Sequence, residues 1–443
     1  MKYRVAFIAL GCAKNLVNCE QMMAQVRDAG HILQSDPEGA DVAVINTCGF
    51  IDSAKEEAIS NILAMGELKQ EGKLKKLIVT GCLSQRYAEE IEEELPEVDG
   101  ILGTGSYNKI VDAIEQTMLG ADYRSFEDIH APVEEIDRVL TTPPWFAYLR
   151  IAEGCDNRCA YCIIPFLRGR FRSRKMEDIV NEAKGLAARG VKELIIVAQD
   201  ITRYGVDLYG KRSLSALLRE LCKLDFHWIR LHYLYPDELD DELIRTIAEE
   251  PKILKYLDIP IQHCNDTVLK KMRRRGNKEF LLETFAKLKR EIPNAVFRTS
   301  LITGLPGEGE EEFEELCEFL SEVKLQRAGV FSFSPQEGTE AATMEFVDTE
   351  EAQRRAELLV DVQSRIIDWY NEETLGQVLE ILCEGFDPQA QMFVGRSYGE
   401  SPDIDGRVYF TADAEIMAGT FVPVRITGVM DGELTGELWE VEA

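Results

Sequence analysis

The residues with the clearest capacity for chemistry are three closely spaced cysteines near the middle of the chain. Cys155, Cys159 and Cys162 form a C-x3-C-x2-C pattern. Three thiolates in one loop suit an iron–sulfur cluster. A structural zinc ion would need a fourth ligand to complete its tetrahedron, and the next histidine after Cys162 is His227. The pattern therefore favours a cluster with one open coordination position, with zinc as the weaker alternative.

Three further cysteines recur at corresponding places in the first hundred residues. Cys12, Cys48 and Cys82 each follow a short apolar run, and they lie 36 and 34 residues apart, close to the length of one strand–helix unit. Ligands of open α/β sheets gather at the carboxyl ends of the strands. If the three strands are neighbours, the three thiols converge at one edge. The alternative is three buried structural cysteines, which their regular recurrence makes weaker.

The segments around these cysteines alternate between strand and helix patterns. Val5–Leu10, Val42–Asn46 and Leu77–Thr80 are short apolar runs, each followed by a longer helical pattern. This order predicts a flavodoxin-like domain over residues 1–120, a parallel sheet with helices on both faces. Residues 121–144 are rich in acids and end in two prolines, which predicts a linker.

A second α/β domain is expected over residues 145–371. Its first predicted strand precedes the Cys155–Cys162 loop, and helical patterns separate the six strands. Six strand–helix units predict a partial, TIM-like (β/α)6 barrel, short of the eight that close a full one. The predicted strands are Ala147–Ala152, Glu193–Ala198, Trp228–Tyr233, Tyr256–Ile261, Val296–Ile302 and Gly329–Phe333.

The remaining residues, 372–443, lose helical periodicity and divide into five short strand patterns separated by Gly, Asp and Pro. A small antiparallel β-barrel of the OB type is the natural prediction. The predicted strands are Gln377–Cys383, Phe393–Arg396, Arg407–Phe410, Phe421–Val429 and Glu433–Glu440.

Composition narrows the class of protein. The chain has 443 residues, of which 45% are hydrophobic, and no run approaches the ~20 apolar residues of a membrane-spanning helix. The apolar run near the start is too short for a signal peptide, so we expect a cytoplasmic protein without membrane contact. The net charge is −29, which disfavours strong nucleic-acid binding and favours basic protein partners.

The cysteine loop resembles that of the radical S-adenosylmethionine (SAM) superfamily, with Tyr161 in the aromatic position of its C-x3-C-x-aromatic-C motif. The resemblance implies a 4Fe–4S cluster whose open iron binds the amino and carboxylate groups of SAM. An electron from that cluster would cleave SAM into methionine and a 5′-deoxyadenosyl radical. The cofactor supplies this chemistry and the protein positions it, so no catalytic residue is expected beyond the cluster ligands.

Over essentially the whole chain, the sequence resembles the radical SAM methylthiotransferases. That resemblance implies a second, sulfur-donating 4Fe–4S cluster held by Cys12, Cys48 and Cys82, and a TRAM domain at the C-terminal end. It also implies that SAM supplies the methyl group. The segments 198–200, 258–263 and 302–308 match family motifs at strand ends, although Ala198-Gln199-Asp200 departs from the usual Gly-Gly-Glu. Residues implied to contact SAM are Tyr161, Gln199, Asp200, Gln262 and Gly304.

Several strings, among them residues 10–18 and 199–205, are similar to the RimO branch of this family. That branch adds a methylthio group to the β-carbon of an aspartate of small-subunit ribosomal protein S-twelve, and it implies a reduced flavodoxin or ferredoxin-type electron donor. Two alternatives stay open at this point. One is a tRNA adenosine methylthiotransferase of the MiaB type, and the other is a non-enzymatic iron–sulfur sensor or scaffold.

The charge of the C-terminal segment separates the two enzymes. Residues 372–443 contain fifteen acids and three arginines with no lysine, a net charge of −12. A barrel that holds tRNA should be basic, whereas an acidic barrel suits a very basic ribosomal protein. We therefore expect this barrel to dock that protein through acids such as Glu400, Asp403 and Asp405.

Two basic stretches and two single cysteines complete the candidates. Residues 168–175, close to the cluster loop, are expected to contact carboxylates of SAM or substrate. Residues 270–275 either do the same or form a solvated face. Cys19 is a candidate accidental thiol near the N-terminal triad. The other single cysteines are expected to pack in the core, and of these Cys264 alone is a candidate for facing the SAM pocket; they are Cys222, Cys264, Cys317 and Cys383.

Overall fold

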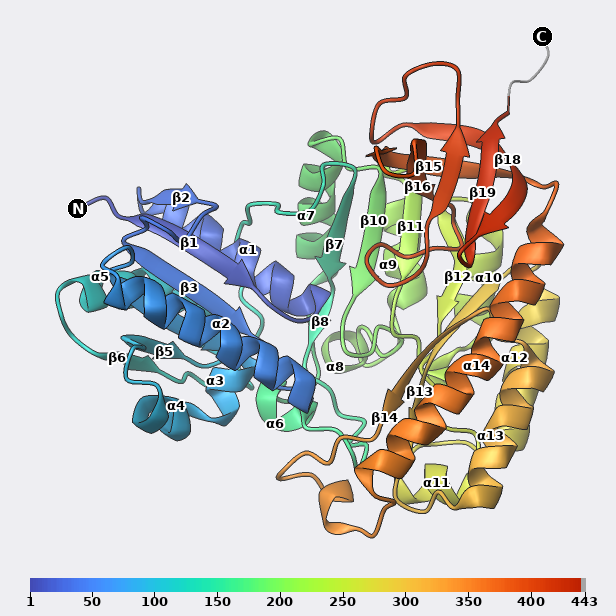
Figure 1. Cartoon of the computed structure of the whole chain (residues 1–443), viewed down its shortest axis with the longest axis horizontal. Helices are drawn as coiled ribbons and strands as arrows, with labels where there is room; N and C mark the ends of the chain where they lie inside the picture. Colours follow the sequence, from blue (N-terminus) through green and yellow to red (C-terminus); the bar gives the residue numbers. More distant parts are fainter. Residues whose placement is uncertain (440–443) are drawn as a thin grey trace.

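The N-terminal cysteines lie on a six-stranded parallel sheet. The structure is a computed structural model that describes residues 1–439, and its three parts are coloured blue, green to orange, and red in Figure 1. The N-terminal sheet has the order β2-β1-β3-β4-β5-β6. Its strands are β1 (Arg4–Ala9), β2 (Ile32–Gln34), β3 (Val42–Thr47), β4 (Lys76–Gly81), β5 (Gly100–Leu102) and β6 (Tyr123–Ser125).

Helices cover both faces of this sheet. On one face, Met22 of α1 and Ile110 of α5 pack with Val44 of the central strand. On the other, Ile62 of α2 packs with Ile45. Successive residues of a strand thus face opposite layers, which confirms the expected parallel α/β domain. β6 lies within the segment that was expected to be a linker, so that expectation is wrong at these residues. The strand was not predicted because its pairing with β5 is too short to leave a sequence pattern. The helices are α1 (Ala13–Asp28), α2 (Asp52–Gln70), α3 (Cys82–Arg86), α4 (Ala88–Glu94), η1 (Tyr107–Lys109) and α5 (Ile110–Met118).

The central part is a six-stranded parallel sheet of order β14-β13-β12-β11-β10-β7, curved into the expected partial barrel. Its strands are β7 (Phe146–Arg150), β10 (Glu193–Val197), β11 (Trp228–Leu231), β12 (Ile253–Asp258), β13 (Val296–Thr303) and β14 (Arg327–Ser332). The helices on its outer face are α7 (Met176–Ala188), α9 (Leu214–Cys222), α10 (Asp241–Glu249), α12 (Lys278–Glu291), α13 (Glu310–Val323) and α14 (Thr349–Thr374).

Smaller elements lie around the mouth of this barrel. A short hairpin pairs β8 with β9 and holds the cysteine loop between its strands. These elements are β8 (Ala152–Glu153), α6 (Ile164–Arg168), β9 (Arg172–Ser173), α8 (Val206–Tyr209), η2 (Pro236–Glu238), α11 (Asp266–Lys271) and η3 (Ala341–Thr343).

The C-terminal part is a closed five-stranded barrel with the order β15-β16-β17-β19-β18, as expected. All neighbouring pairs are antiparallel except β17 with β19, which is parallel. The strands are β15 (Val378–Asp387), β16 (Met392–Arg396), β17 (Val408–Thr411), β18 (Phe421–Met430) and β19 (Glu433–Leu438). Glu440, the last residue of the final predicted strand, lies outside the described residues.

Two elements fasten the three parts together. Helix α1 closes the open side of the central barrel, where its Val17 packs against Tyr148 and Ile195. The loop between β16 and β17 packs against residues of several strands of the central barrel and of the segments that follow them. There the Glu400 carboxylate accepts a hydrogen bond from Arg327 at 2.8 Å, and Ser401 Oγ lies 2.9 Å from His232 Nε2.

This loop corrects one expectation from the sequence. Glu400 is 1% exposed, and Asp405 accepts a hydrogen bond from the Tyr256 hydroxyl at 2.6 Å. Both acids therefore hold the two barrels together and are not available to a docking protein. Asp403 alone of the three is exposed. Among residues 1–439, the longest helices carry too many polar side chains for any of them to span a membrane.

Candidate active site

The Cys155–Cys162 loop is held at the mouth of the central barrel by backbone hydrogen bonds at several points. The Cys155 N–H donates to the Gly169 carbonyl at 3.1 Å, and the Ala160 N–H donates to the Met272 carbonyl at 3.0 Å. Gly154 has a φ of +79°, and a Cβ there would lie 2.1 Å from the Arg170 carbonyl oxygen. Only glycine fits this close approach, so Gly154 determines the direction in which the loop leaves β8.

The three thiols of this loop share a largely buried site. Cys155 and Cys159 are each 8% exposed. Burial raises the pKa of Cys155 to about 11, despite hydrogen bonds from Asn157, and burial likewise raises the pKa of Cys162, with the neighbouring thiols adding to the effect. Such thiols stay protonated until a metal displaces the proton. In the described part of the chain, no three His, Cys, Asp or Glu side chains surround one metal-sized point. A 4Fe–4S cluster binds each cysteine to a different iron, so its ligands stand farther apart, and this donor set fits it.

Arg274 lies directly beside this cysteine loop. Its guanidinium is 8% exposed, its Nη1 lies 3.8 Å from Cys159 Sγ, and it stacks 4.5 Å from the centroid of the Tyr235 ring. The guanidinium thus places a positive charge next to the cysteine loop. The expectation of a solvated face over residues 270–275 is therefore wrong at Arg274, although Arg273 and Arg275 do form exposed ion pairs.

The second triad forms where three neighbouring strands end. Cys12 precedes α1, Cys48 follows β3 and Cys82 begins α3. A Cβ on Gly11 would lie 2.7 Å from Cys48 Cβ, and one on Gly49 would lie 2.8 Å from the Leu83 backbone. The strand ends thus touch, and the three thiols are close enough to influence one another's ionisation. The expected convergence at one sheet edge is present.

Charges distinguish the cysteines of this triad. Burial and the neighbouring Cys82 raise the pKa of Cys48 to about 11. Burial also raises the pKa of Cys12, but the charges of Lys14 and Arg168 outweigh it and leave that pKa below its usual value. Cys12 is also the exposed member of this triad, whereas Cys82 is buried.

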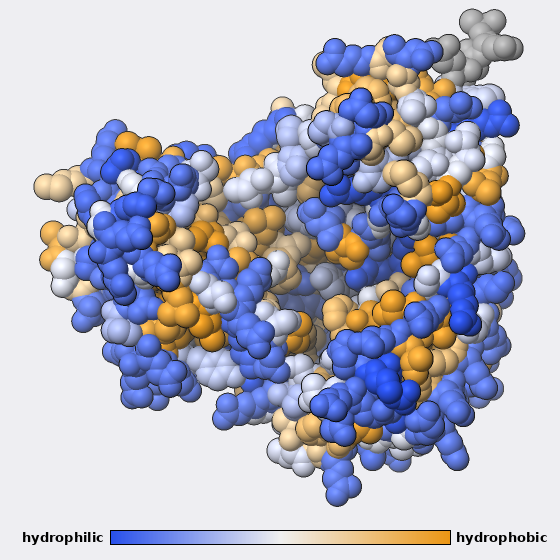
Figure 2. All heavy atoms as spheres, viewed as in Figure 1, coloured by the Kyte–Doolittle hydropathy of each residue, from blue (hydrophilic) through white to orange (hydrophobic). Residues whose placement is uncertain are grey.

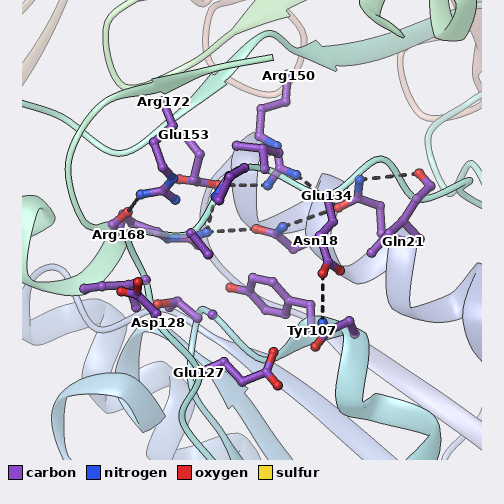
Figure 3. Close-up of a pocket in the computed structure, with 18 residues that line it drawn as sticks. Asn18, Gln21, Tyr107, Glu127, Asp128, Glu134, Arg150, Glu153, Arg168 and Arg172 are labelled. Atoms are coloured by element: carbon purple, nitrogen blue, oxygen red, sulfur yellow. Dashed lines mark hydrogen bonds and ion pairs between the residues drawn. The ribbon is translucent and has the colours of Figure 1, made fainter. Parts of the chain in front are cut away.

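Arg168 connects the two triads. It ends α6, just after the Cys155–Cys162 loop, yet its guanidinium donates to Asn15 at 2.9 Å and, as Figure 3 shows, to Asn18 at 2.8 Å. Both asparagines lie on α1. Its third partner is Glu153, at 3.4 Å. The sequence predicted that this basic stretch binds carboxylates of SAM or substrate. In the structure Arg168 binds side chains of the protein, and so does Arg174, which pairs with Glu182 at 2.7 Å.

A small pocket of about 110 Å³ lies behind Arg168, between α1, the segment 127–136 and the hairpin of β8 and β9 (Figure 3). The Tyr107 hydroxyl and the Nε atoms of Arg150 and Arg172 are buried here without a hydrogen-bond partner. At ~30 Å³ per water molecule, the space suits a few waters that would satisfy these groups. None of the six triad cysteines lines this pocket, so it belongs to the junction between domains.

The residues expected to contact SAM gather at the carboxyl ends of the barrel strands. Gln199 donates through Nε2 to Glu153 at 2.7 Å, while its Oε1 is buried without a partner. Asp200 is fully buried and accepts from Asn157 Nδ2 at 2.9 Å. Two of these residues thus brace the cysteine loop, and the free oxygen of Gln199 leaves one acceptor for a ligand.

The other three residues expected to contact SAM differ in their surroundings. Tyr161 packs against Met272 in the core beneath the loop. Gln262 has a φ of +70°, and backbone strain of this kind is common at ligand sites. Gly304 has a φ of +77°, and a Cβ there would lie 2.5 Å from that of Ala352 on α14. Close packing of α14 therefore explains this glycine without a ligand.

The two single cysteines lie in the core. Cys19 is 1% exposed on α1, and burial raises its pKa to about 12. Cys264 is fully buried, and its thiol lies 3.6 Å from the Glu315 carbonyl on α13. Both thiols therefore pack in the interior of the described structure.

Sequence reasoning missed Lys14, Glu153 and Tyr233 at the junction. Lys14 was visible between Cys12 and Asn15, but nothing in the sequence showed that its Nζ lies 3.6 Å from the centroid of the Tyr233 ring. The space-filling view in Figure 2 shows a hollow in the surface between the N-terminal domain and the central barrel. The strands β7 and β10 end near this place in Figure 1. Cys82 of the second triad packs with Ile163 and Leu167, which follow Cys162 in the chain, so the second triad borders the segment that holds the first.

Three family models match the chain in sequence order. They are Uncharacterized protein family UPF0004 over residues 4–103, the Radical SAM superfamily over residues 149–320 and a TRAM domain over residues 375–438. A solved structure of the radical SAM methyltransferase TsrM from Kitasatospora setae superposes with a TM-score of 0.56 at 13% identity, covering 76% of this chain and 77% of that one. The fold and the cysteine loop thus define a radical SAM enzyme, which uses SAM and an iron–sulfur cluster.

Full-length relatives narrow this class. A ribosomal protein uS12 methylthiotransferase RimO from Lachnoclostridium phytofermentans is 48% identical, covering 98% of this chain and 99% of the relative. The protein of the same name from Thermoanaerobacter sp. is 46% identical with the same coverage. At this identity and coverage, the chain belongs to the RimO family of methylthiotransferases.

Proposed function

We propose that this enzyme adds a methylthio group to the β-carbon of an aspartate of ribosomal protein uS12. The observation that carries the proposal is the similarity, over 98% of the chain, to relatives named as uS12 methylthiotransferases. The acidic C-terminal barrel supports it, because a net charge of −12 over residues 372–443 attracts a basic protein and repels tRNA. A ribosomal substrate implies a cytoplasmic enzyme.

Two iron–sulfur clusters would divide the work. Cys155, Cys159 and Cys162 would hold the cluster that binds SAM, and Cys12, Cys48 and Cys82 would hold a second one. With SAM bound, the first would supply radical chemistry, and the second would supply sulfur. The convergence of two separate triads on one junction supports this division, since the substrate carbon must meet both the radical and the sulfur.

The protein's own side chains position these groups. Arg274 and Tyr235 flank Cys159, so they would orient that ligand and balance its charge. Gln199, Asp200, Gln262, Tyr161 and Gly304 stay candidates for contacts to SAM, and the unpaired Gln199 Oε1 is the acceptor best placed for its amino group. The electron would come from a reduced flavodoxin or ferredoxin-type protein.

A single substrate comparison tests the proposal. The reconstituted enzyme is incubated anaerobically with SAM, sulfide, a reductant and either uS12 or unmodified tRNA, and both products are analysed by mass spectrometry. We expect one methylthio group in place of one hydrogen on an aspartate of uS12, and unmodified tRNA. Methylthiolated adenosine in the tRNA together with unmodified uS12 would support the MiaB-type alternative instead.

A further inference from the structure

Lys14 occupies a position that elementary electrostatics disfavours. It lies in the first turn of α1, two residues after Cys12, and is only 6% exposed. A positive charge in the first turn opposes the helix macrodipole, and a buried ammonium group costs free energy unless it is paired. A lysine retained at such a place requires a partner that compensates its charge.

The described residues provide no carboxylate for it. Across residues 1–439, no ion pair includes Lys14. The nearby buried acids have other partners: Glu153 pairs with Arg150 at 2.8 Å, and Asp258 pairs with Arg298 at 2.8 Å. The ammonium group instead rests on the Tyr233 ring, 3.6 Å from its centroid. An ammonium group has three N–H donors, so this contact with one face leaves donors for a ligand.

The ring that supports Lys14 is itself held firmly. Tyr233 follows β11 at the mouth of the central barrel and has a φ of +64°, a strained conformation for a bulky residue. Its N–H donates to Asp258 at 3.0 Å, which fixes the turn. Helix α1 meanwhile packs against β7 and β10 through Val17. Lys14 therefore reaches from the N-terminal domain, next to Cys12, to Tyr233 at the mouth of the central barrel.

We propose that Lys14 binds the side-chain carboxylate of the acceptor aspartate and thereby selects aspartate over asparagine. This inference rests on the proposed function. The acceptor carbon is bonded directly to that carboxylate, so when this carbon lies between the triads its carboxylate lies there too. A carboxylate would satisfy the buried ammonium, whereas the neutral amide of asparagine would leave the charge unpaired.

A double-mutant cycle on binding tests the inference without turnover. The reconstituted enzyme with SAM but no reductant is titrated with uS12 and with uS12 whose acceptor aspartate is changed to asparagine. We expect the parent enzyme to prefer the aspartate form by roughly tenfold, as for other desolvated charge pairs. Lys14→Gln should bind both forms equally, and Lys14→Arg should keep part of the preference. Lys73→Gln, at an exposed lysine that pairs with Glu38 and Glu71, is the matched control and should behave as the parent.

The iron content of each variant is measured in parallel, because Lys14 lies beside Cys12. An unchanged preference in Lys14→Gln would overturn the inference. So would an equal loss of affinity for both forms accompanied by loss of iron, because Lys14 would then serve only the cluster. The proposed function is tested separately by adding reductant to the parent enzyme. If uS12 stays unmodified, the proposed function fails and the inference fails with it; if uS12 is modified, only the binding cycle decides.

Discussion

Arg168 follows the cluster loop in the sequence, but its side chain binds residues of α1 in the N-terminal domain and so helps to hold the junction together. It is 3% exposed, binds Asn15 and Asn18 of α1 and shares Glu153 with Arg150. One guanidinium thus links the segment after the cluster loop to the helix that begins at Cys12.

Replacing Arg168 by Met should destabilise the folded protein by about 3–5 kcal/mol, because it removes one partner from a buried ionic network. Thermal unfolding under anaerobic conditions would show a lower midpoint. Arg170→Met, at an exposed residue of the same stretch, should shift the midpoint very little. Equal midpoints for the two variants would contradict the role given to Arg168.

At the residue scale, the sequence predicted which residues carry the chemistry of the site better than it predicted which residues contact them. The six cysteines were recognisable because their spacing in one loop, or at three strand ends, is a local property. The partners of Arg168, Arg274 and Lys14 were not, since each contacts a residue from a distant part of the chain. Glu400 and Asp405 illustrate the same limit: an acid in a polar loop reads as exposed until the partner arginine or tyrosine is located.

At the scale of elements, the loop between β16 and β17 joins the two barrels through a buried polar network. Glu193 pairs with both Arg230 at 2.6 Å and Arg396 at 2.7 Å, and His232 lies 2.9 Å from Ser401. Burial lowers the pKa of His232 to about 4, so the folded protein keeps this histidine neutral at neutral pH.

This histidine predicts a pH dependence of stability. In the unfolded chain this histidine binds a proton near pH 6.5, whereas in the folded protein it binds one only near pH 4. His232 therefore leaves the free energy of unfolding unchanged above pH 6.5 and lowers it as the pH falls toward 4. The slope should approach ~1.4 kcal/mol per pH unit. His232→Asn should flatten the slope of unfolding free energy in this range, whereas His130→Asn, at an exposed residue, should not. Parallel slopes for the parent and His232→Asn would contradict this assignment.

The main elements followed from hydrophobic patterns, and the exceptions have physical causes. The six strands of the central barrel and the five of the small barrel fall close to their predicted positions. In the N-terminal sheet, β2, β5 and β6 were missed because three residues are too few to show alternation. The docking of α1 into the open side of the central barrel was also beyond prediction, since an apolar residue such as Val17 does not reveal which surface it covers.

At the scale of the whole molecule, the charge of the small barrel predicts how fast the enzyme associates with its substrate. Since Glu400 and Asp405 are internal, docking of a basic protein depends on the acids that the small barrel exposes. Reversing four of them to lysine should slow association with uS12. The difference in association rate from the parent should shrink at high salt, because screening weakens the electrostatic interaction with uS12 in both proteins. The four are Asp413, Glu415, Asp431 and Glu437.

The same change of net charge elsewhere is the control for this prediction. Four exposed acids of α4 are reversed to lysine in a second variant, and association rates of both are measured across salt concentrations. The acids are Glu89, Glu90, Glu93 and Glu94. Equal losses in the two variants would mean that overall charge, and not the barrel surface, governs association.

The central claim is that two cysteine triads, brought to one junction, perform different parts of one reaction. The most direct test measures 5′-deoxyadenosine and methylthiolated uS12 in the same anaerobic reaction of a Cys12→Ala, Cys48→Ala, Cys82→Ala variant. We expect about half of the parent's iron, continued formation of 5′-deoxyadenosine and no methylthiolated uS12. Methylthiolated uS12 at the parent's level would contradict the division of labour between the triads.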